Sequence, residues 1–195
     1  DNRGQMPKIL FYVIDLTTKE VTNITNDIFS ESSPSWSSNG EIIYFTSDRG
    51  QNTSANNMYD VDFSQTDIFQ YSYQTNTVSQ ITNTEYNENY PVASSDGNLF
   101  YTADYNGITN IFKHNLINNE AFPITNVVTG VQQIDLDSSD NLVFSGFKKR
   151  GWDLYIMNNP NSFLEKEIKP TKFYVNKNRS TDFEDLRTFT SKKAS

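Results

Sequence analysis

The strongest constraint on the fold of this chain is an internal repeat. An Ile-Thr-Asn triplet occurs three times, at residues 24–26, 81–83 and 124–126. The interval from Ile81 to Ile124 is 43 residues, and that from Ile24 to Ile81 is 57 residues. The additional 14 residues of the longer interval lie between Gly50 and Asp67. A period of this length predicts similar supersecondary units that pack side by side along the chain.

Each repeat carries further elements at matching offsets. A turn comes first, at 37–40, 94–97 and 138–141. In the first repeat an apolar run at 42–46 and an alternating strand at 67–71 follow the turn. The same two elements recur at 99–102 and 110–114 in the second repeat, and at 142–145 and 153–157 in the third. Four short strands in about forty residues are typical of a β-propeller blade, because a small sheet that is apolar on both faces must stack against its neighbours.

Composition agrees with an all-β protein and excludes several function classes. The chain has 195 residues, of which 14% are aromatic, and its apolar residues are mostly of types that suit a pleated sheet. The formal net charge is −8, so nucleic acid is not an expected partner. Cysteine is absent, which excludes disulfides and Cys-ligated zinc within the chain. No apolar run approaches the roughly 18 residues of a membrane span, and no direct span is expected.

The stretch PSWSSNGEIIYFTSDRG at residues 34–50 has the residues of a known repeat. The matching residues, in order, are Pro34, Trp36, Ser37, Gly40, Ile43, Phe45, Ser47, Asp48, Arg49 and Gly50. They resemble the TolB-like propeller repeats, also called PD40 or WD40-like repeats, whose form is close to P-x-W-S-P-D-G-x-x-I-x-F-x-S-D-R-G. The resemblance covers residues 1–158, although the second copy lacks the Trp and the third lacks the Pro and Gly. Propeller domains of prolyl-oligopeptidase-like peptidases are similar too.

The resemblance implies which strand lies innermost in each blade. The Pro-x-Trp strand is then innermost and the apolar-Thr strand outermost. We expect an all-β propeller of four-stranded antiparallel blades, with three complete blades and a half blade, as part of a larger ring. The half blade is expected at 1–25, and the complete blades at 33–82, 90–125 and 131–168. The propeller segment thus spans 1–170, and residues 171–195 form a C-terminal strand or tail.

The half blade admits two interpretations. In the first, the sequence is a piece of a longer propeller. In the second, strands near residues 172–176 and 186–190 return to complete the half blade and close a four-bladed ring. We favour the first, because residues 171–195 carry no Pro-x-Trp or Ser-Asp-Gly signature. Remaining blades or another subunit are then expected to cover the open blade faces.

Motifs that would carry catalysis are missing from the sequence. There is no G-x-S-x-G elbow and no Gly-rich phosphate loop, and His114 is the single histidine. His114 falls in an alternating strand, which favours a packing role over a catalytic one. We therefore predict that the chain is not an enzyme and binds no cofactor.

One acidic cluster suggests a metal site. Asp135, Asp137 and Asp140 alternate with other residues, as oxygen ligands of calcium can. However, Asp140 falls at the position in the turn that Asn39 and Asp96 have in the other repeats. We therefore interpret the cluster as residues that stabilise a turn rather than as a metal site. A structural calcium ion elsewhere in the ring is compatible with the sequence, but no specific motif supports one.

Loops on one rim of the propeller are the best candidates for binding. In a propeller, the connections between blades share a rim with the loops that join the second and third strands, and loops on a rigid scaffold commonly carry function. Aromatic residues, Arg and carboxylates fall there. The candidate partner-binding residues are Phe29, Glu31, Arg49, Met58, Tyr59, Tyr86, Glu88, Tyr105, Arg150 and Trp152. For Phe29 and Tyr86 the alternative is a hydrophobic cover over the blade tops.

From the resemblance we expect a non-catalytic scaffold that binds a protein partner in the bacterial cell envelope, as part of an envelope or secretion assembly. This implies a periplasmic location or association with the outer membrane. The alternative is the regulatory propeller of a prolyl-oligopeptidase-like serine peptidase whose catalytic domain lies outside this chain. A carbohydrate-binding propeller is a third hypothesis. All three rest on analogy of fold.

Overall fold

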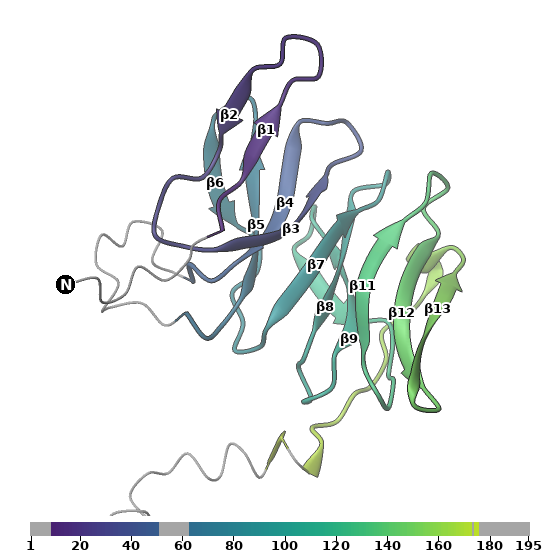
Figure 1. Ribbon diagram of the computed structural model, residues 1–195. Coiled ribbons are helices and arrows are strands. Elements are labelled where there is room, and N and C mark those ends of the chain that lie inside the picture. The colour runs from purple at the N-terminus through teal and green to yellow at the C-terminus, as the bar shows by residue number, and fades with distance from the viewer. Residues whose placement is uncertain (1–8, 51–62, 173, 176–195) are drawn as a thin grey trace, which may run out of the picture.

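Four antiparallel sheets follow one another along the chain and fan out side by side (Figure 1). The computed structural model describes residues 9–50, 63–172, 174 and 175. We name the sheets the half-blade, blade 1, blade 2 and blade 3. This architecture confirms the predicted all-β propeller.

The half-blade and the two central blades have regular strand order. The half-blade contains β1 (Tyr12–Ile14) and β2 (Val21–Asn23). Blade 1 has the order β3-β4-β5-β6, with β3 Glu31–Trp36, β4 Ile42–Ser47, β5 Asp67–Ser72 and β6 Thr77–Gln80. Blade 2 repeats this order with β7 Glu88–Ala93, β8 Asn98–Ala103, β9 Asn110–Asn115 and β10 Glu120–Pro123. The inner strands of blades 1 and 2 thus begin two residues before the predicted blade starts at 33 and 90.

In the part of the chain that the structure describes, blade 3 has three strands, whereas four were predicted. It contains β11 (Val131–Leu136), β12 (Leu142–Lys148) and β13 (Gly151–Met157). The chain then forms a 3-10 helix, η2 (Pro160–Ser162), and runs to blade 2, where the Lys166 N–H donates to the Pro123 carbonyl at 2.8 Å. The expected outer strand within 131–168 is therefore not formed on β13.

A sequence difference accompanies the missing fourth strand. Where the earlier repeats have Ile-Thr-Asn, this one has Ile168-Lys169-Pro170, which supplies no Thr hydroxyl and lacks one backbone N–H donor. Beyond it, Val175 N–H donates to the Thr171 carbonyl at 3.0 Å, and residues 172, 174 and 175 have helical backbone. The strand expected near 172–176 is thus a helical turn in its described part, and 186–190 lie outside the described residues.

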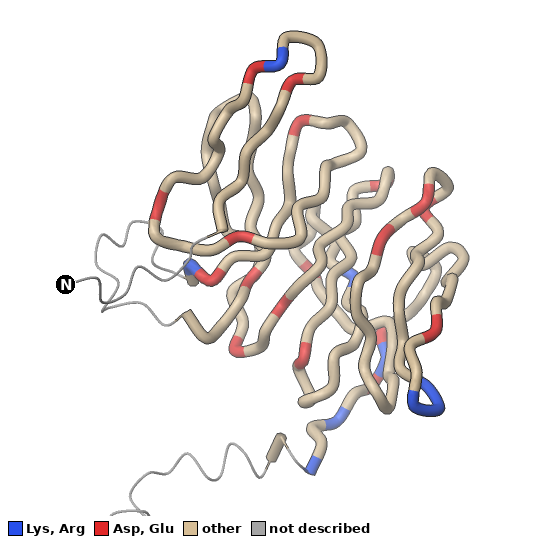
Figure 2. Tube along the Cα trace, in the orientation of Figure 1, with Lys and Arg blue, Asp and Glu red and all other residues tan. Residues whose placement is uncertain are grey.

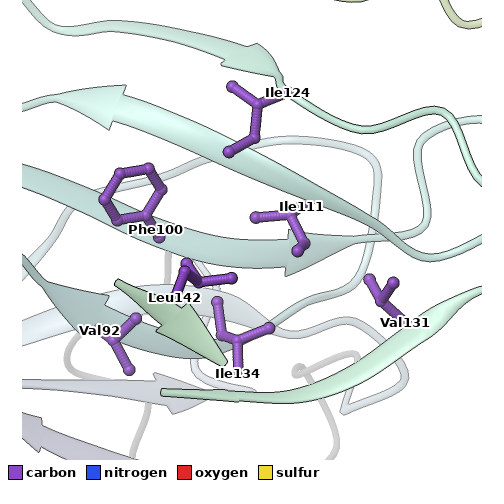
Figure 3. Packing of buried hydrophobic residues seen from close by; sticks show 7 residues of the cluster. All are labelled: Val92, Phe100, Ile111, Ile124, Val131, Ile134 and Leu142. Carbon is purple, nitrogen blue, oxygen red and sulfur yellow. The ribbon is translucent and has the colours of Figure 1, made fainter. Parts of the chain in front are cut away.

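The hydrophobic core lies between the blades rather than within one of them. Figure 3 shows the cluster between blades 2 and 3, where Phe100 and Ile111 face Ile134 and Leu142. A second cluster joins blade 1 to blade 2 around Ile68 and Tyr101, and a third lies between the half-blade and blade 1. Because both faces of a blade are apolar, each blade stabilises its two neighbours.

The inner strands share a bulge that the sequence pattern does not reveal. The strand register shifts once in each inner strand, and the residue at the shift has a left-handed backbone. These residues are Ser33 (φ 53°), Tyr90 (φ 55°) and Gln133 (φ 52°). A non-glycine residue with positive φ is uncommon, so its recurrence at equal offsets shows that the three blades are built alike.

The Thr of each Ile-Thr-Asn triplet attaches the end of the outer strand to the third strand. The Oγ1 atoms of Thr25, Thr82 and Thr125 accept hydrogen bonds from the backbone N–H groups of Phe11, Ile68 and Ile111, at 2.9, 2.8 and 2.8 Å. All three Thr side chains are buried. A buried N–H without an acceptor is costly, which explains why the triplet repeats with the blades.

We expect the substitution Thr125→Val to lower the free energy of unfolding by about 1–2 kcal/mol, because the buried Ile111 N–H loses its acceptor while the side-chain volume hardly changes. The matched control is Thr22→Val, at an exposed position of β2, which is expected to change stability by less than about 0.5 kcal/mol. Urea unfolding of both variants measures the difference. Equal stabilities of the two variants would contradict the role of this hydroxyl.

Candidate functional site

The predicted rim is present in the structure. We define it as residues 26–30, 83–87 and 126–130 between blades, with 48–50, 104–109 and 148–150 between second and third strands. In each blade the two kinds of loop are joined by hydrogen bonds. The Ser30 and Asn87 N–H groups donate to the Asp48 and Asp104 carboxylates at 2.9 and 2.8 Å, and Thr129 Oγ1 donates to the Phe147 carbonyl. These contacts hold the rim loops on the blades.

Three of the predicted partner-binding residues form a buried cluster under the rim. Arg49 is 3% exposed, and its Nη2 and Nη1 atoms lie 2.5 Å from Glu31 Oε1 and 3.1 Å from Asp27 Oδ2. The guanidinium lies over the ring of Phe29 at 5.1 Å. Phe29 and Glu31 are 1% and 0% exposed. Phe29, Glu31 and Arg49 were predicted to contact a partner, but the structure places all three side chains in the interior, with Phe29 as a cover over Arg49.

This cluster joins the half-blade to blade 1. Asp27 and Phe29 follow the half-blade, whereas Glu31 begins β3 and Arg49 follows β4. Thr25 Oγ1 also donates to Glu31 Oε2 at 2.9 Å. Burial raises the pKa of Glu31 to about 7, and the hydrogen bond from Thr25 and the charge of Arg49 act against this rise. The carboxylate is thus held by partners from both sheets.

Glu88 occupies the same position in blade 2, and no described Lys or Arg forms an ion pair with it. It begins β7 and is 1% exposed, and Thr84 Oγ1 donates to its Oε1 atom at 3.1 Å. Its Oε2 atom has no hydrogen-bond partner within the described part of the chain. Burial raises the pKa of Glu88 to about 7, and the charges of Asp67 and Asp104 add to the rise. Glu88, predicted to contact a partner, is thus a buried acid between blades.

The third equivalent position shows what replaces these acids. Val131 begins β11, seven residues after Ile124, as Glu88 lies seven residues after Ile81. Here Thr125 Oγ1 donates to Asn110 Oδ1 at 3.1 Å instead of to a carboxylate. A buried acid is therefore not required at every blade junction.

Tyr86 and Tyr105 form an aromatic pair on the rim between blades 1 and 2. Their ring centroids are 4.6 Å apart in an edge-to-face arrangement, and both side chains are half-buried. Tyr105 takes the place in blade 2 that Arg49 has in blade 1. Burial raises the pKa of Tyr86, and the neighbouring hydroxyls of Tyr105 and Tyr174 add to the rise. These two predicted residues remain available to a partner in part.

Arg150 and Trp152 are exposed, as a binding role requires. Arg150 lies in the turn between β12 and β13, and Trp152 is the second residue of β13. Lys148, Lys149 and Arg150 form the basic turn of the rim (Figure 2). Trp152 is 53% exposed and packs edge-to-face on Phe147 at 5.4 Å. The predicted residues Met58 and Tyr59 lie outside the described residues.

Between blades 2 and 3 the rim is hollowed by a groove that the sequence did not reveal. Two adjoining concavities of about 200 and 410 Å³ share Ile108 and Val128. We call them the rim groove. It extends from Trp152 to the segment that crosses back from blade 3, which contributes Glu167, Lys169 and Thr171. Val128 is 86% exposed. The sequence alone does not reveal this exposure, because it depends on where the returning segment lies relative to the loop that carries Val128.

The remaining polar candidates have structural roles. His114 is buried in β9, and its Nε2 atom lies 2.9 Å from Asn119 Oδ1. Asp137 Oδ1 accepts the Ser139 and Asn141 N–H groups at 2.8 Å, and these hydrogen bonds help to lower the pKa of Asp137. The side chain of Asp137 therefore serves the turn, in line with the interpretation of the acidic cluster as turn chemistry.

Asp140 corrects one detail of the predicted turn. The Asp140 N–H donates to the Asp137 carbonyl. In the other two turns the N–H groups of Gly40 and Gly97 donate to the carbonyls of Ser37 and Ser94. Asp140 is therefore equivalent to these glycines and not to Asn39. Its φ of 57° agrees with this. Within residues 9–50, 63–172, 174 and 175, no group of three His, Cys, Asp or Glu side chains is placed to hold a metal ion. The same residues contain no helix long and apolar enough to cross a bilayer.

Solved structures of similar fold identify the architecture. TolB from Acinetobacter baumannii superposes with a TM-score of 0.57 at 19% identity, over 82% of this chain and 37% of that chain. A putative TolB from Agrobacterium tumefaciens gives 0.58 at 14% identity, over 72% of this chain and 49% of that chain. The fold is that of a TolB-like β-propeller. This chain therefore spans less than half the length of these TolB structures.

A TolB-like propeller is also part of larger enzymes. A prolyl endopeptidase structure superposes with a TM-score of 0.52 at 9% identity, over 87% of this chain and 26% of that chain. No protein-family model matches the sequence, and no curated protein matches it either. At these identities the likeness concerns the fold, so function must be argued from the site.

Proposed function

We propose that this chain is a non-catalytic, protein-binding propeller that holds its partner in the rim groove. The observation that carries the proposal is the exposed apolar lining of the groove, with Val128 at its centre and Trp152 at one end. Exposed aromatic side chains next to a concavity are the usual anchors of protein interfaces. Because hydrogen bonds already fix the rim loops, these loops lose little conformational entropy when a partner binds.

The charged residues of the groove favour binding over catalysis. Lys169 Nζ lies 3.0 Å from Glu167 Oε1, and both side chains are about four-fifths exposed, so neither is desolvated as an acid or base usually is. His114, the single histidine, lies in the core and not in the groove. The groove as the described residues form it thus offers apolar and polar contacts, and its Lys169–Glu167 pair is exposed to solvent.

The cell-envelope part of the proposal rests on the likeness to TolB. We propose a periplasmic or outer-membrane-associated location, with a protein partner that belongs to an envelope or secretion assembly. The chain would act there as a docking module. The likeness to a prolyl endopeptidase supports a second candidate, in which the partner of the propeller is an α/β-hydrolase domain.

Site-specific photo-crosslinking in cells that carry the native gene tests the proposal. A benzophenone amino acid at Val128 is expected to capture a protein, whereas the same group at Ile117 is not. Ile117 is equally exposed, at 88%, but lies at the opposite end of blade 2. With the captured protein purified, Trp152→Ala should weaken binding at least tenfold and Ile117→Ala should not. Equal capture at both positions would refute the rim groove as the binding site.

A fluorophosphonate probe then separates the two candidate functions. The probe labels the active serine of α/β-hydrolases. A captured protein that reacts with it supports the peptidase-associated propeller, and one that does not react supports the envelope scaffold.

A further inference from the structure

Blade 3 leaves an apolar face without a neighbour in the described residues. Leu154 and Ile156 alternate along β13 with the half-buried Tyr155 and Met157, and they point to the side away from blade 2. Their exposed fractions are 79% and 69%. We call these two residues the blade-3 face. A run of exposed apolar side chains on one face of a sheet is unusual for a monomer and marks an interaction surface.

The internal repeat shows what normally covers such a face. Leu154 is equivalent to Ile68 of blade 1 and Ile111 of blade 2. It pairs with Ser145 as Ile68 and Ile111 pair with Thr46 and Thr102, and each of these second-strand residues pairs with the second residue of its inner strand. Ile68 and Ile111 are fully buried against the next blade. The position of Leu154 is thus one that packs on a following blade.

The opposite end of the chain exposes the complementary kind of face. Tyr12 and Ile14 in β1 are 56% and 55% exposed, and Val21 beside Ile14 is 60% exposed. We call these three residues the half-blade face. Tyr12 is equivalent to Phe69 and Phe112, which are 0% and 9% exposed and pack towards the preceding blade.

The two open faces therefore have opposite roles. The blade-3 face corresponds to the side of a blade that receives the next blade, and the half-blade face to the side that packs on the preceding one. Leu154 and Ile156 lie on β13, the third strand of blade 3, and Tyr12 and Ile14 lie on β1, the third strand of the half-blade, so the same strand position is open at each end (Figure 1).

We propose that a second copy of this chain docks its half-blade face on the blade-3 face, head to tail. This association goes beyond the proposed rim function and does not depend on it. The contact is heterologous, because different surfaces of the two copies meet, and it continues the blade-on-blade packing already present within one chain. Apolar burial at Leu154, Ile156, Tyr12 and Ile14 is its main source of stability.

Light scattering after size exclusion tests the proposal. The wild-type chain is expected to associate as its concentration rises, with a mass that increases above the 22.4 kDa of one chain. Leu154→Asp and Ile14→Asp should each remain at the mass of one chain. Ile117→Asp, at an exposed position outside both faces, should associate as the wild type does. A wild-type chain that stays monomeric at every concentration would overturn the proposal, as would association that neither variant reduces.

Mixing the two variants is the decisive experiment for the head-to-tail contact. Leu154→Asp retains an intact half-blade face, and Ile14→Asp retains an intact blade-3 face. An equimolar mixture should therefore form a dimer and nothing larger, since only one contact can form. A mixture that remains monomeric overturns the head-to-tail contact. Circular dichroism checks folding, and Leu154→Lys with Ile14→Lys replaces any Asp variant that does not fold.

Discussion

Replacing Arg49 by methionine is expected to lower the free energy of unfolding by about 3–5 kcal/mol, the usual cost of removing one partner from a buried ion pair. The guanidinium lies 2.5 Å from Glu31 and 3.1 Å from Asp27, and Glu31 is fully buried. Methionine retains most of the side-chain length. It leaves the two carboxylates without their cation, so the loss reflects charge rather than volume.

Arg150→Met is the matched control, because Arg150 also precedes a glycine in a turn of the rim but is exposed. We expect this variant to lose less than about 0.5 kcal/mol. The double variant Arg49→Met with Glu31→Gln should recover a large part of the loss, since it also removes the buried charge of Glu31. Urea unfolding measures all three variants. Similar stabilities of the two single variants would show that the buried cluster does not stabilise the junction of half-blade and blade 1.

Replacing Glu88 by glutamine is expected to stabilise the protein above pH 7, by an amount on the order of 3 kcal/mol. Burial raises the pKa of Glu88 from 4.5 to about 7, so the folded chain binds a proton more tightly than the unfolded chain does. The resulting stability is fully present below about pH 4.5 and is lost as the pH rises through about 7. Glutamine cannot ionise, and the variant avoids this loss.

The difference between Glu88→Gln and wild type should therefore grow between about pH 4.5 and pH 7 and stay constant above. Thermal or urea unfolding across this range measures it. Glu85→Gln, on the exposed part of the same rim loop, should keep the pH dependence of the wild type. The pKa of Glu31 is also raised to about 7, so the stability of every variant that retains Glu31 still depends on pH to some extent. A difference between Glu88→Gln and wild type that is independent of pH would contradict a buried ionisable group at this junction.

Strands and turns of the propeller could be predicted from the sequence because they depend on local patterns. The alternation in residues 110–114 and the Ser-Ser-Asp-Gly turn at 94–97 each specify a strand or a hairpin within a few residues of chain. The Ile-Thr-Asn triplet marked the outer strands correctly. Its physical reason, a Thr hydroxyl that accepts a backbone N–H of the third strand, became clear only from the hydrogen bonds.

The candidate site was predicted in part. Trp152 and Arg150 are exposed as expected, whereas Phe29, Glu31, Arg49 and Glu88 are buried. Charged residues in loops are usually exposed, so the sequence favoured the surface for them. What reversed this at Arg49 and Glu31 is their mutual ion pair between adjacent strands of blade 1, 18 residues apart along the chain, together with Thr25 and Asp27 from the half-blade side.

The sequence by itself determined that this protein is built of repeated, four-stranded blades, since period, alternation and turn residues act over short distances. Only the tertiary structure decided which loop residues are buried and that blade 3 stops at three strands. It also decided that a groove opens between blades 2 and 3. The physical reason is the same in each case: these features depend on which segment of a neighbouring blade supplies a hydrogen bond, a charge or an apolar surface.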